Sequence, residues 1–135
     1  MNDYEIILLA LVAWREARSE GPIGMAAVMH VIANRVKQGW GGWIKVITAA
    51  SQFASMTVKG DSQTVAWPQT GDKVFEVALA EASIVHSGEH ADQTAGALYY
   101  ANLKTATSGW FFTNIANNPE DHPQTAVIGK HTFFA

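Results

Sequence analysis

Hydrophobic residues recur every three to four positions along three stretches of the chain, the spacing of one face of an α-helix. The first stretch predicts a helix that begins with Asp3 as its N-cap and runs to about Arg18. The second follows the Gly21-Pro22 break, where proline suits the first helical turn, and runs to about Lys37. The third extends from Asp72 to His86. These three helices are expected to form most of the core.

The rest of the chain has shorter patterns. A short helix is expected from Ile44 to Phe53, and residues 57–72, with two glycines and a proline, predict a long irregular connection. Two short runs with strand character, Ala97–Ala101 and Val127–Phe133, predict a pair of strands joined by a loop. No repeat or linker divides the chain. We therefore expect one domain over residues 1–135, α+β and mainly helical, with a small antiparallel β element near the C-terminus.

Composition narrows the class of protein. The chain has 135 residues, 48% hydrophobic and 16% charged, which is typical of a globular domain that can bury a core. It has no cysteine, which excludes disulfides and thiolate metal sites. The longest apolar run, Ile6–Trp14, is far too short to span a bilayer, and acidic residues precede it where a secretion signal would be basic. We expect neither membrane insertion nor a signal peptide.

The charge of −3 is unevenly divided along the chain. Residues 1–59 carry six Lys and Arg against four Asp and Glu, whereas residues 60–135 carry three against eight. A strongly basic surface is absent, which disfavours nucleic acid as a partner. The asymmetry could orient a charged polymer, although an ordinary solvated surface explains it as well.

Two carboxylates mark the end of the first predicted helix. Glu16 and Glu20 would lie one turn apart on one face, unless the following break turns the second away. The negative end of the helix dipole and apolar neighbours such as Trp14 would favour a protonated carboxyl at Glu16, as a general acid requires. The alternative is a surface ion-pair cluster, in which Arg15 and Arg18 neutralise the two carboxylates.

Glycoside hydrolysis normally uses two carboxylates about 5 to 9.5 Å apart. No motif singles out a partner for Glu16, and the acidic residues available are Glu20, Asp61, Asp72, Glu76 and Glu81. One glutamate suffices where the substrate supplies its own nucleophile. It can then protonate the leaving oxygen and afterwards accept the proton of the attacking hydroxyl.

Aromatic residues gather in the predicted loops and at strand ends, where their rings suit the C–H faces of sugars. They are Trp40, Trp43, Trp67, Tyr99, Tyr100, Trp110, Phe111 and Phe112. Asn102, Thr113 and Asn114 could bond hydroxyl or acetamido groups, although half or more of the rings could equally fill the core. Because neighbours on a strand point to opposite faces, at most one of Tyr99 and Tyr100 is expected to face a cleft.

The histidines do not form a recognisable metal motif. His86 and His90 have i,i+4 spacing but no third ligand at a telling distance, so they predict a solvated helix end. His30 is expected to be packed inside its helix, and His131 to bond across to the other strand. Neither a G-x-S-x-G motif nor a phosphate-binding glycine loop is present. No metal and no other cofactor is expected.

Four ordered blocks of residues carry a resemblance to a known family. They are Glu16-Ala17-Arg18-Ser19-Glu20 with Gly24, Ala27-Val28, Val31 and Asn34-Arg35; Phe53-Ala54-Ser55-Met56; Gly96-Ala97, Tyr100 and Asn102; and Ile128-Gly129, His131 and Phe133. In these blocks the chain resembles the SleB-like cell-wall hydrolases, which include spore cortex-lytic enzymes and related phage or prophage proteins. It departs from the family pattern at Ser19, Met56 and Phe134, where the family has glycine, tryptophan and tyrosine.

The resemblance implies a lysozyme-like fold and action on the glycan strands of peptidoglycan. It also implies that Glu16 is the catalytic acid/base of a lytic transglycosylase, in which the 6-hydroxyl of muramic acid attacks its own C1 and leaves a 1,6-anhydro end. Together with the residue chemistry, it leads us to expect substrate contacts at Glu20, Phe53, Ser55, Tyr100, Asn102, Trp110, Thr113 and His131.

The phage-type members of the family suggest how the protein would work in a cell. We expect an endolysin-like monomer that is made in the cytoplasm, released by a holin, and active on the cell wall. Two alternatives stay open. One is a hydrolytic muramidase or glucosaminidase in which Glu20 or Asp72 activates water. The other is a non-catalytic glycan-binding or virion structural module.

Overall fold

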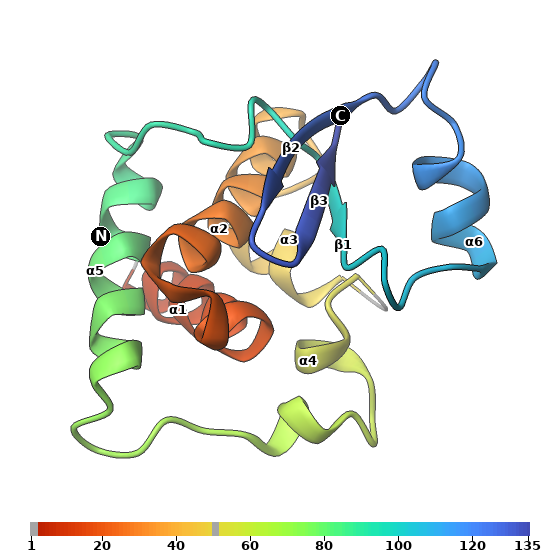
Figure 1. The fold of residues 1–135 in the computed structure, drawn as a ribbon. Coiled ribbons are helices and arrows are strands. Elements are labelled where there is room, and N and C mark those ends of the chain that lie inside the picture. The colour runs from red at the N-terminus through yellow and green to blue at the C-terminus, as the bar shows by residue number, and fades with distance from the viewer. Residues whose placement is uncertain (1–2, 50–51) are drawn as a thin grey trace.

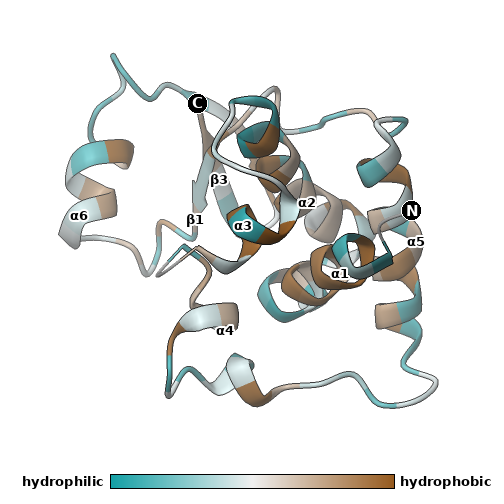
Figure 2. Cartoon of the chain, turned by 180° about the vertical axis from the view of Figure 1, so that it is seen from behind, coloured by the Kyte–Doolittle hydropathy of each residue, from teal (hydrophilic) through white to brown (hydrophobic). Residues whose placement is uncertain are grey.

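Three helices, α1 (Asp3–Ala17), α2 (Gly21–Lys37) and α5 (Lys73–Ser87), form the body of the molecule. The computed structural model describes residues 3–49 and 52–135. In Figure 1 the three helices lie together, and a small sheet and helix α6 lie on the other side. The hydrophobic stretches in Figure 2 run along α1, α2 and α5. Their fully buried side chains include Leu9, Met29 and Ala82, so the predicted helical stripes do build the core.

The ends of these helices follow from local sequence. Pro22 lies in the first turn of α2, where its missing N–H is no loss. Asp72 is the N-cap of α5, and its side chain accepts the N–H of Phe75 at 2.9 Å. Gly88 ends α5 in the left-handed conformation, at φ 82°. Asp3, in contrast, lies within the first turn of α1, so its predicted place before the helix is wrong.

The segments between and after these helices contain short elements that the pattern did not separate. They are η1 (Arg18–Glu20), α3 (Trp43–Thr48), α4 (Ala54–Thr57), η2 (Ser62–Val65), α6 (Gly109–Phe111) and the π-helical turn η3 (Phe112–Ala116). The helix expected from Ile44 to Phe53 is therefore wrong in its extent. Part of that prediction, residues 50–51, lies outside the described residues. The connection over residues 57–72 is irregular as predicted, apart from η2.

The sheet has three antiparallel strands, β1 (Tyr99–Ala101), β2 (Gln124–Ile128) and β3 (His131–Phe134), in the order β1-β3-β2. Tyr100 pairs with Phe133, and Ile128 pairs with His131. The predicted strand Val127–Phe133 is therefore a hairpin, because the chain reverses at Gly129 and Lys130. The predicted β element is confirmed as antiparallel and C-terminal, but it has three strands.

The described structure confirms a mainly helical α+β fold with a small antiparallel sheet. Within residues 3–49 and 52–135, none of the helices is long and apolar enough to cross a bilayer. The sheet packs on α2 through a second small core, in which Ala27 and Val31 contact Phe133. This contact places β1 beside the C-terminal end of α1, where the candidate site lies.

Candidate active site

Glu16 lies in the last turn of α1 and is held by a residue from β1. The hydroxyl of Tyr100 donates a hydrogen bond to Glu16 Oε1 at 2.7 Å. Burial, followed by the nearby Glu16 carboxylate, raises the pKa of Tyr100 well above its ordinary value. Tyr100 therefore stays protonated and can always donate. The second carboxylate oxygen of Glu16 has no hydrogen-bond partner among the described residues.

A cleft of about 780 Å³ opens in front of this pair. One wall comes from α2, the loop after it and the start of α4, and the other from β1, the turn that follows it and α6. Among the described residues that line the cleft, Glu16 is the only carboxylate. A cleft of this size fits a ligand of several sugar units, and it presents one acid to that ligand.

The cleft brings together most, but not all, of the predicted site residues. Those in its lining are Glu16, Phe53, Tyr100, Asn102, Trp110 and His131. Ser55 lies outside the lining, with its buried Oγ unpartnered in the described structure. Thr113 is exposed on η3 and also lies outside it. The roles of these residues toward a substrate stay predictions.

Glu20 lies behind the cleft and holds the β2–β3 turn. Its Oε1 accepts the N–H of Lys130 at 2.9 Å and lies 3.8 Å from His131 Nδ1. The turn needs glycine, because Gly129 has φ 57° and a Cβ there would come within 3.0 Å of the Glu20 carboxylate. Glu20 does not line the cleft, so its predicted contact with substrate stays a prediction.

His131 connects this anchor to the pair formed by Glu16 and Tyr100. Its ring meets the edge of the Tyr100 ring at a centroid distance of 5.0 Å. Burial lowers the pKa of His131, although the carboxylates of Glu20 and Glu16 oppose that shift. A neutral imidazole thus lies between Glu20 and Tyr100. The sequence predicted a bond from His131 across to the other strand, but the contacts of its side chain are with these residues.

Both tyrosines of β1 lie in the wall of the cleft, so the expectation that at most one would do so is wrong. β1 is an edge strand, and a cleft that follows such an edge can meet side chains from both faces of the sheet. Tyr99 packs against Trp40 at a centroid distance of 5.8 Å, and Tyr100 turns to Glu16.

Arg35 and Gln52 line the cleft and were not among the predicted site residues. Arg35 is 5% exposed, and its Nε donates to the carbonyl oxygen of Leu98 at 2.8 Å. Its Nη1 donates to Gln52 at 3.3 Å, and its guanidinium lies over the ring of Trp40. A signal for Arg35 was present, because an arginine three residues after Ile32 falls on the apolar face of its helix.

The arginines beside the two carboxylates turn away from them. Arg15 donates to the carbonyl oxygens of Ser55 and Ala66, each at 3.0 Å, and Arg18 donates to the side chain of Gln63 at 2.6 Å. They fasten α4 and η2 to α1. Neither arginine forms an ion pair with Glu16 or Glu20 in the described structure, so the alternative of a surface ion-pair cluster is wrong.

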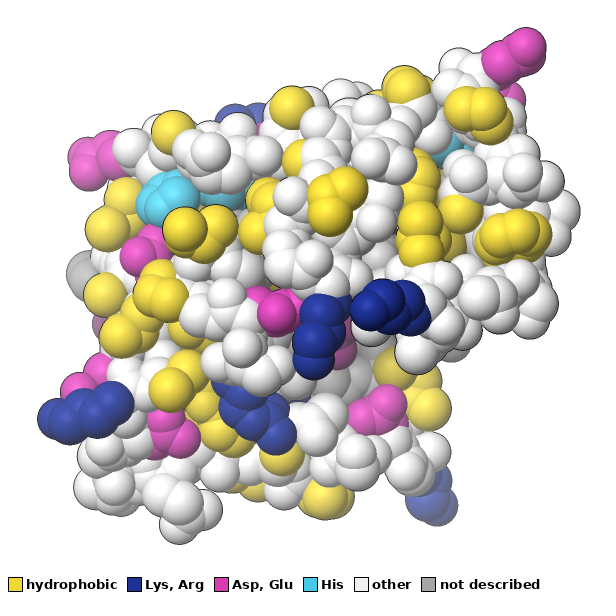
Figure 3. All heavy atoms as spheres, in the orientation of Figure 1, with side chains coloured by type: hydrophobic (Ala, Val, Ile, Leu, Met, Phe, Trp, Pro, Cys, Tyr) yellow, Lys and Arg dark blue, Asp and Glu magenta, His cyan; other side chains and the backbone are white. Residues whose placement is uncertain are grey.

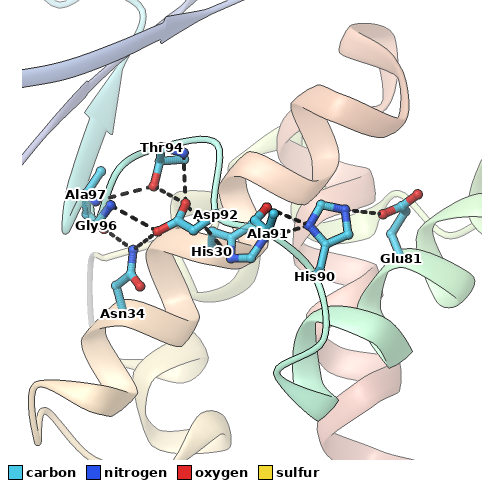
Figure 4. A network of polar contacts seen from close by, with 9 residues as sticks. All are labelled: His30, Asn34, Glu81, His90, Ala91, Asp92, Thr94, Gly96 and Ala97. Atoms are coloured by element: carbon cyan, nitrogen blue, oxygen red, sulfur yellow. Dashed lines mark hydrogen bonds and ion pairs between the residues drawn. The ribbon is translucent and has the colours of Figure 1, made fainter.

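A second polar cluster joins α2, α5 and the loop between α5 and β1 (Figure 4). His30 Nε2 lies 2.9 Å from His90 Nδ1, and His90 Nε2 lies 3.0 Å from Glu81 Oε2. Asp92 accepts hydrogen bonds from Asn34 and from the backbone and hydroxyl of Thr94. This network, which we call the loop network, fixes the segment that leads into β1.

The predicted solvated helix end at His86 and His90 is therefore wrong. His86 Nε2 lies 2.9 Å from Glu5 Oε1 and its ring packs on Trp43, while His90 belongs to the loop network. His30 is packed inside α2 as predicted, with 5% of its surface exposed. Across residues 3–49 and 52–135, no group of three or more histidine and carboxylate side chains is placed to hold a metal ion.

The sequence and the fold were compared with known proteins. A family model described as Cell Wall Hydrolase matches residues 19–134. The chain belongs to the cell wall hydrolase family. The matched range begins three residues after Glu16, but alignments with individual relatives extend over 96 to 98% of the chain.

These relatives are spore cortex-lytic enzymes. One from Halalkalibacterium halodurans is 30% identical over 98% of this chain, and one from Oceanobacillus iheyensis is 33% identical over 96%. The aligned regions make up 35% and 41% of those two proteins. The chain thus spans well under half the length of the curated relatives it matches.

Two solved structures resemble the whole fold. The catalytic domain of the germination-specific lytic transglycosylase SleB from Bacillus anthracis matches with a TM-score of 0.72 and 30% identity, over 100% of this chain and 97% of that domain. The catalytic domain of SleB from Bacillus cereus matches with a TM-score of 0.67 and 31% identity, over 97% and 89% of the two chains. The predicted SleB-like resemblance and lysozyme-like fold class are confirmed.

Proposed function

We propose that this protein cleaves the glycan strand of peptidoglycan between N-acetylmuramic acid and N-acetylglucosamine, as a lytic transglycosylase with Glu16 as its acid/base. The observation that carries the proposal is the single carboxylate in the lining of the cleft. Membership of the cell wall hydrolase family and the likeness to a lytic transglycosylase domain support it.

The geometry suggests how one carboxylate could serve two steps. Because Tyr100 bonds to Oε1 of Glu16, the other oxygen, Oε2, is left to carry the proton. In the first step that proton passes to the glycosidic oxygen, the bond from C1 to that oxygen breaks, and positive charge develops at C1. Glu16 is then an ionised carboxylate, which faces the charge it helped to create.

In the second step the 6-hydroxyl of the same muramic acid attacks C1. Its oxygen forms the new bond, its proton returns to Glu16, and the product is a 1,6-anhydro ring. No water enters the reaction and the enzyme regains its starting state. The nucleophile belongs to the bound sugar, so its effective concentration is high without a second catalytic carboxylate.

Product analysis tests this proposal against hydrolysis. Purified sacculi digested with the protein should release muropeptides that end in 1,6-anhydro-muramic acid, which mass spectrometry identifies as one water lighter than the hydrolytic product. Treatment with borohydride should leave these ends unreduced. Reducible muramic acid ends would show hydrolysis instead, and the absence of any cleavage would favour the binding-module alternative.

The cellular route belongs to the same proposal. We propose an endolysin-like monomer that reaches the wall through a holin, and the resemblance to phage and prophage members of the family supports it. Expression in bacteria with and without a co-expressed holin tests the route. Lysis should require the holin, whereas lysis from the protein alone would contradict it.

A further inference from the structure

A second hollow adjoins the cleft on the side of the β2–β3 turn. Its volume is about 260 Å³, and it is lined by residues from the turn after β1 and from the hairpin. Asn102 lines both the cleft and this hollow, so the two are neighbours at that residue. The hollow therefore lies next to the space where a polymer would bind beside Glu16.

Two lysines, Lys104 and Lys130, line this hollow. Figure 3 shows basic side chains gathered near the middle of this face, over the β2–β3 turn and the end of β1. Residues 60–135 contain three basic residues against eight acidic ones, and two of the three meet here. Neither lysine forms an ion pair among the described residues, whereas the third, Lys73, pairs with Glu76 at 3.5 Å.

The backbone at both lysines is fixed by side chains of the site. The N–H of Lys104 donates to Asn102 Oδ1 at 3.0 Å, and the N–H of Lys130 donates to Glu20 Oε1 at 2.9 Å. Each bond holds the backbone of a short turn. The two ammonium groups are thus presented from fixed turns, which lowers the entropy cost of binding an anion.

We propose that this hollow binds a free carboxylate of the peptide stem carried by the muramic acid in the cleft. The proposal rests on the function proposed above. The sugar rings and acetamido groups of the strand are neutral, so they gain no electrostatic attraction from the two unpaired lysines. The hollow also exposes Leu103 and Val127, whose apolar side chains suit the alanine methyl groups of a stem better than a phosphate polymer.

The test compares three peptidoglycan preparations that differ in the anionic groups they carry. One keeps its stems. A second consists of glycan strands stripped of stems by an amidase, so that their only carboxylate is that of the lactyl group on muramic acid. A third keeps its stems but loses phosphate polymers through hydrofluoric acid. The wild type should show a KM about fivefold lower on the first and third than on the second, the effect of two exposed ion pairs. This gap should narrow in high salt.

The variant Lys104→Gln/Lys130→Gln should raise the KM on intact sacculi to the value for stripped strands, with kcat changed little. The matched control is Lys73→Gln. This variant removes a surface lysine that does not line the hollow, and it should keep the difference in KM between stemmed and stripped strands. Lys104→Arg/Lys130→Arg keeps both positive charges and should therefore keep most of the difference in KM.

Equal KM values for stemmed and stripped strands would overturn the proposal, and so would a gap that the glutamine variant retains. If the low KM is lost when the phosphate polymers are removed, the hollow binds phosphate, and the proposal of a stem carboxylate is overturned. The comparison of KM values requires that the wild type cleaves at least the stemmed preparations. Absence of cleavage on all three preparations would instead refute the proposed function.

Discussion

The cleft and the loop network use the same kinds of side chain and differ in how their carboxylates are satisfied. In the loop network Asp92 accepts four hydrogen bonds, two on each oxygen, from Asn34, Thr94 and Gly96. In the cleft Glu16 accepts one, from Tyr100, and its second oxygen has no partner in the described structure. A carboxylate whose two oxygens both accept hydrogen bonds from its own protein serves a structural role. A carboxylate with one free oxygen can exchange a proton with a ligand.

The space around the two carboxylates also differs, because Glu16 faces a large cleft and the loop network has only a small hollow beside it. The hollow beside His30 and His90 has a volume of about 60 Å³, against about 780 Å³ for the cleft. Hydrogen bonds from Thr94 and Asn34 lower the pKa of Asp92 even though burial pushes it upward. Asp92 is thus committed to its ionised form, as a structural acceptor should be. This difference supports the role in chemistry proposed for Glu16 and indicates a structural role for Asp92.

Replacement of Glu16 by Gln should give the largest effect. The variant keeps an oxygen to accept the bond from Tyr100 but cannot donate a proton, so kcat should fall about 10³-fold. Its thermal midpoint should stay near that of the wild type. The rate at which anhydro ends are released from sacculi measures kcat, and calorimetry measures the thermal midpoint. A variant that keeps a tenth of the activity would remove Glu16 from the chemistry.

Replacement of Asp92 by Ala should do the reverse. It leaves the donors of Asn34, Thr94 and Gly96 without their acceptor, and the free energy of unfolding should fall by about 3 kcal/mol. The folded fraction should keep its kcat. Denaturant unfolding measures the loss, and Asp72→Ala is the matched control. That variant removes one N-cap bond and should cost about 1 kcal/mol.

Replacement of Tyr100 by Phe tests whether the bond to Glu16 contributes to the reaction. Loss of one hydrogen bond to a charged group should lower kcat about tenfold, with a smaller change in KM. Tyr4→Phe, at a residue that is 80% exposed, controls for loss of a hydroxyl elsewhere. An unchanged kcat in the Tyr100 variant would mean that the bond only orders the apo site.

The smallest effect should come from pH. Burial lowers the pKa of His30 from its ordinary value of 6.5, and the nearby His90 and Lys37 add to this while Asp92 opposes it. The unfolded chain then binds a proton at His30 more readily than the folded one. Stability from this residue is complete above pH 6.5 and is lost as the pH falls toward its lowered pKa.

Thermal unfolding at pH 8 and pH 5.5 measures this loss. His30→Gln should lose less stability on acidification than the wild type. The lowered pKa of His131 acts in the same direction in both proteins, so the difference between them isolates His30. Equal losses in the two proteins would show that the loop network does not titrate as its burial suggests.

The long helices were predictable because each has enough turns for its apolar spacing to be read and clear signals at its ends, such as Pro22 and Asp72. The hairpin was not, since Val127 to Phe133 reads as one apolar run and only Gly129 marks the reversal. Helix α6 has three residues, too few for any periodicity. Short elements take their form from tertiary contacts that a local pattern does not contain.

The candidate site was predictable where residues carried a motif and not where geometry decided. Glu16 and Tyr100 were predicted from separate blocks, but nothing in their 84-residue separation indicates that they touch. Glu20 was grouped with the substrate contacts because it shares a motif with Glu16. Its bond to the backbone of Lys130 lies in a part of the sequence that the motif does not contain. Arg35 was interpreted only as part of a motif, because its spacing indicates burial on the apolar face of α2 but not the partners it meets there.

The strand order has a consequence for the timing of synthesis. Among the described strands, β3 is the last in the chain and the middle one of the sheet, and β1 and β2 pair with it rather than with each other. The helices can associate while the chain is still growing, but the sheet lacks its centre until residues 131–134 leave the ribosome. Tyr100 is seated against Glu16 only after that. The candidate site thus stays incomplete while the helical part of the protein can already fold.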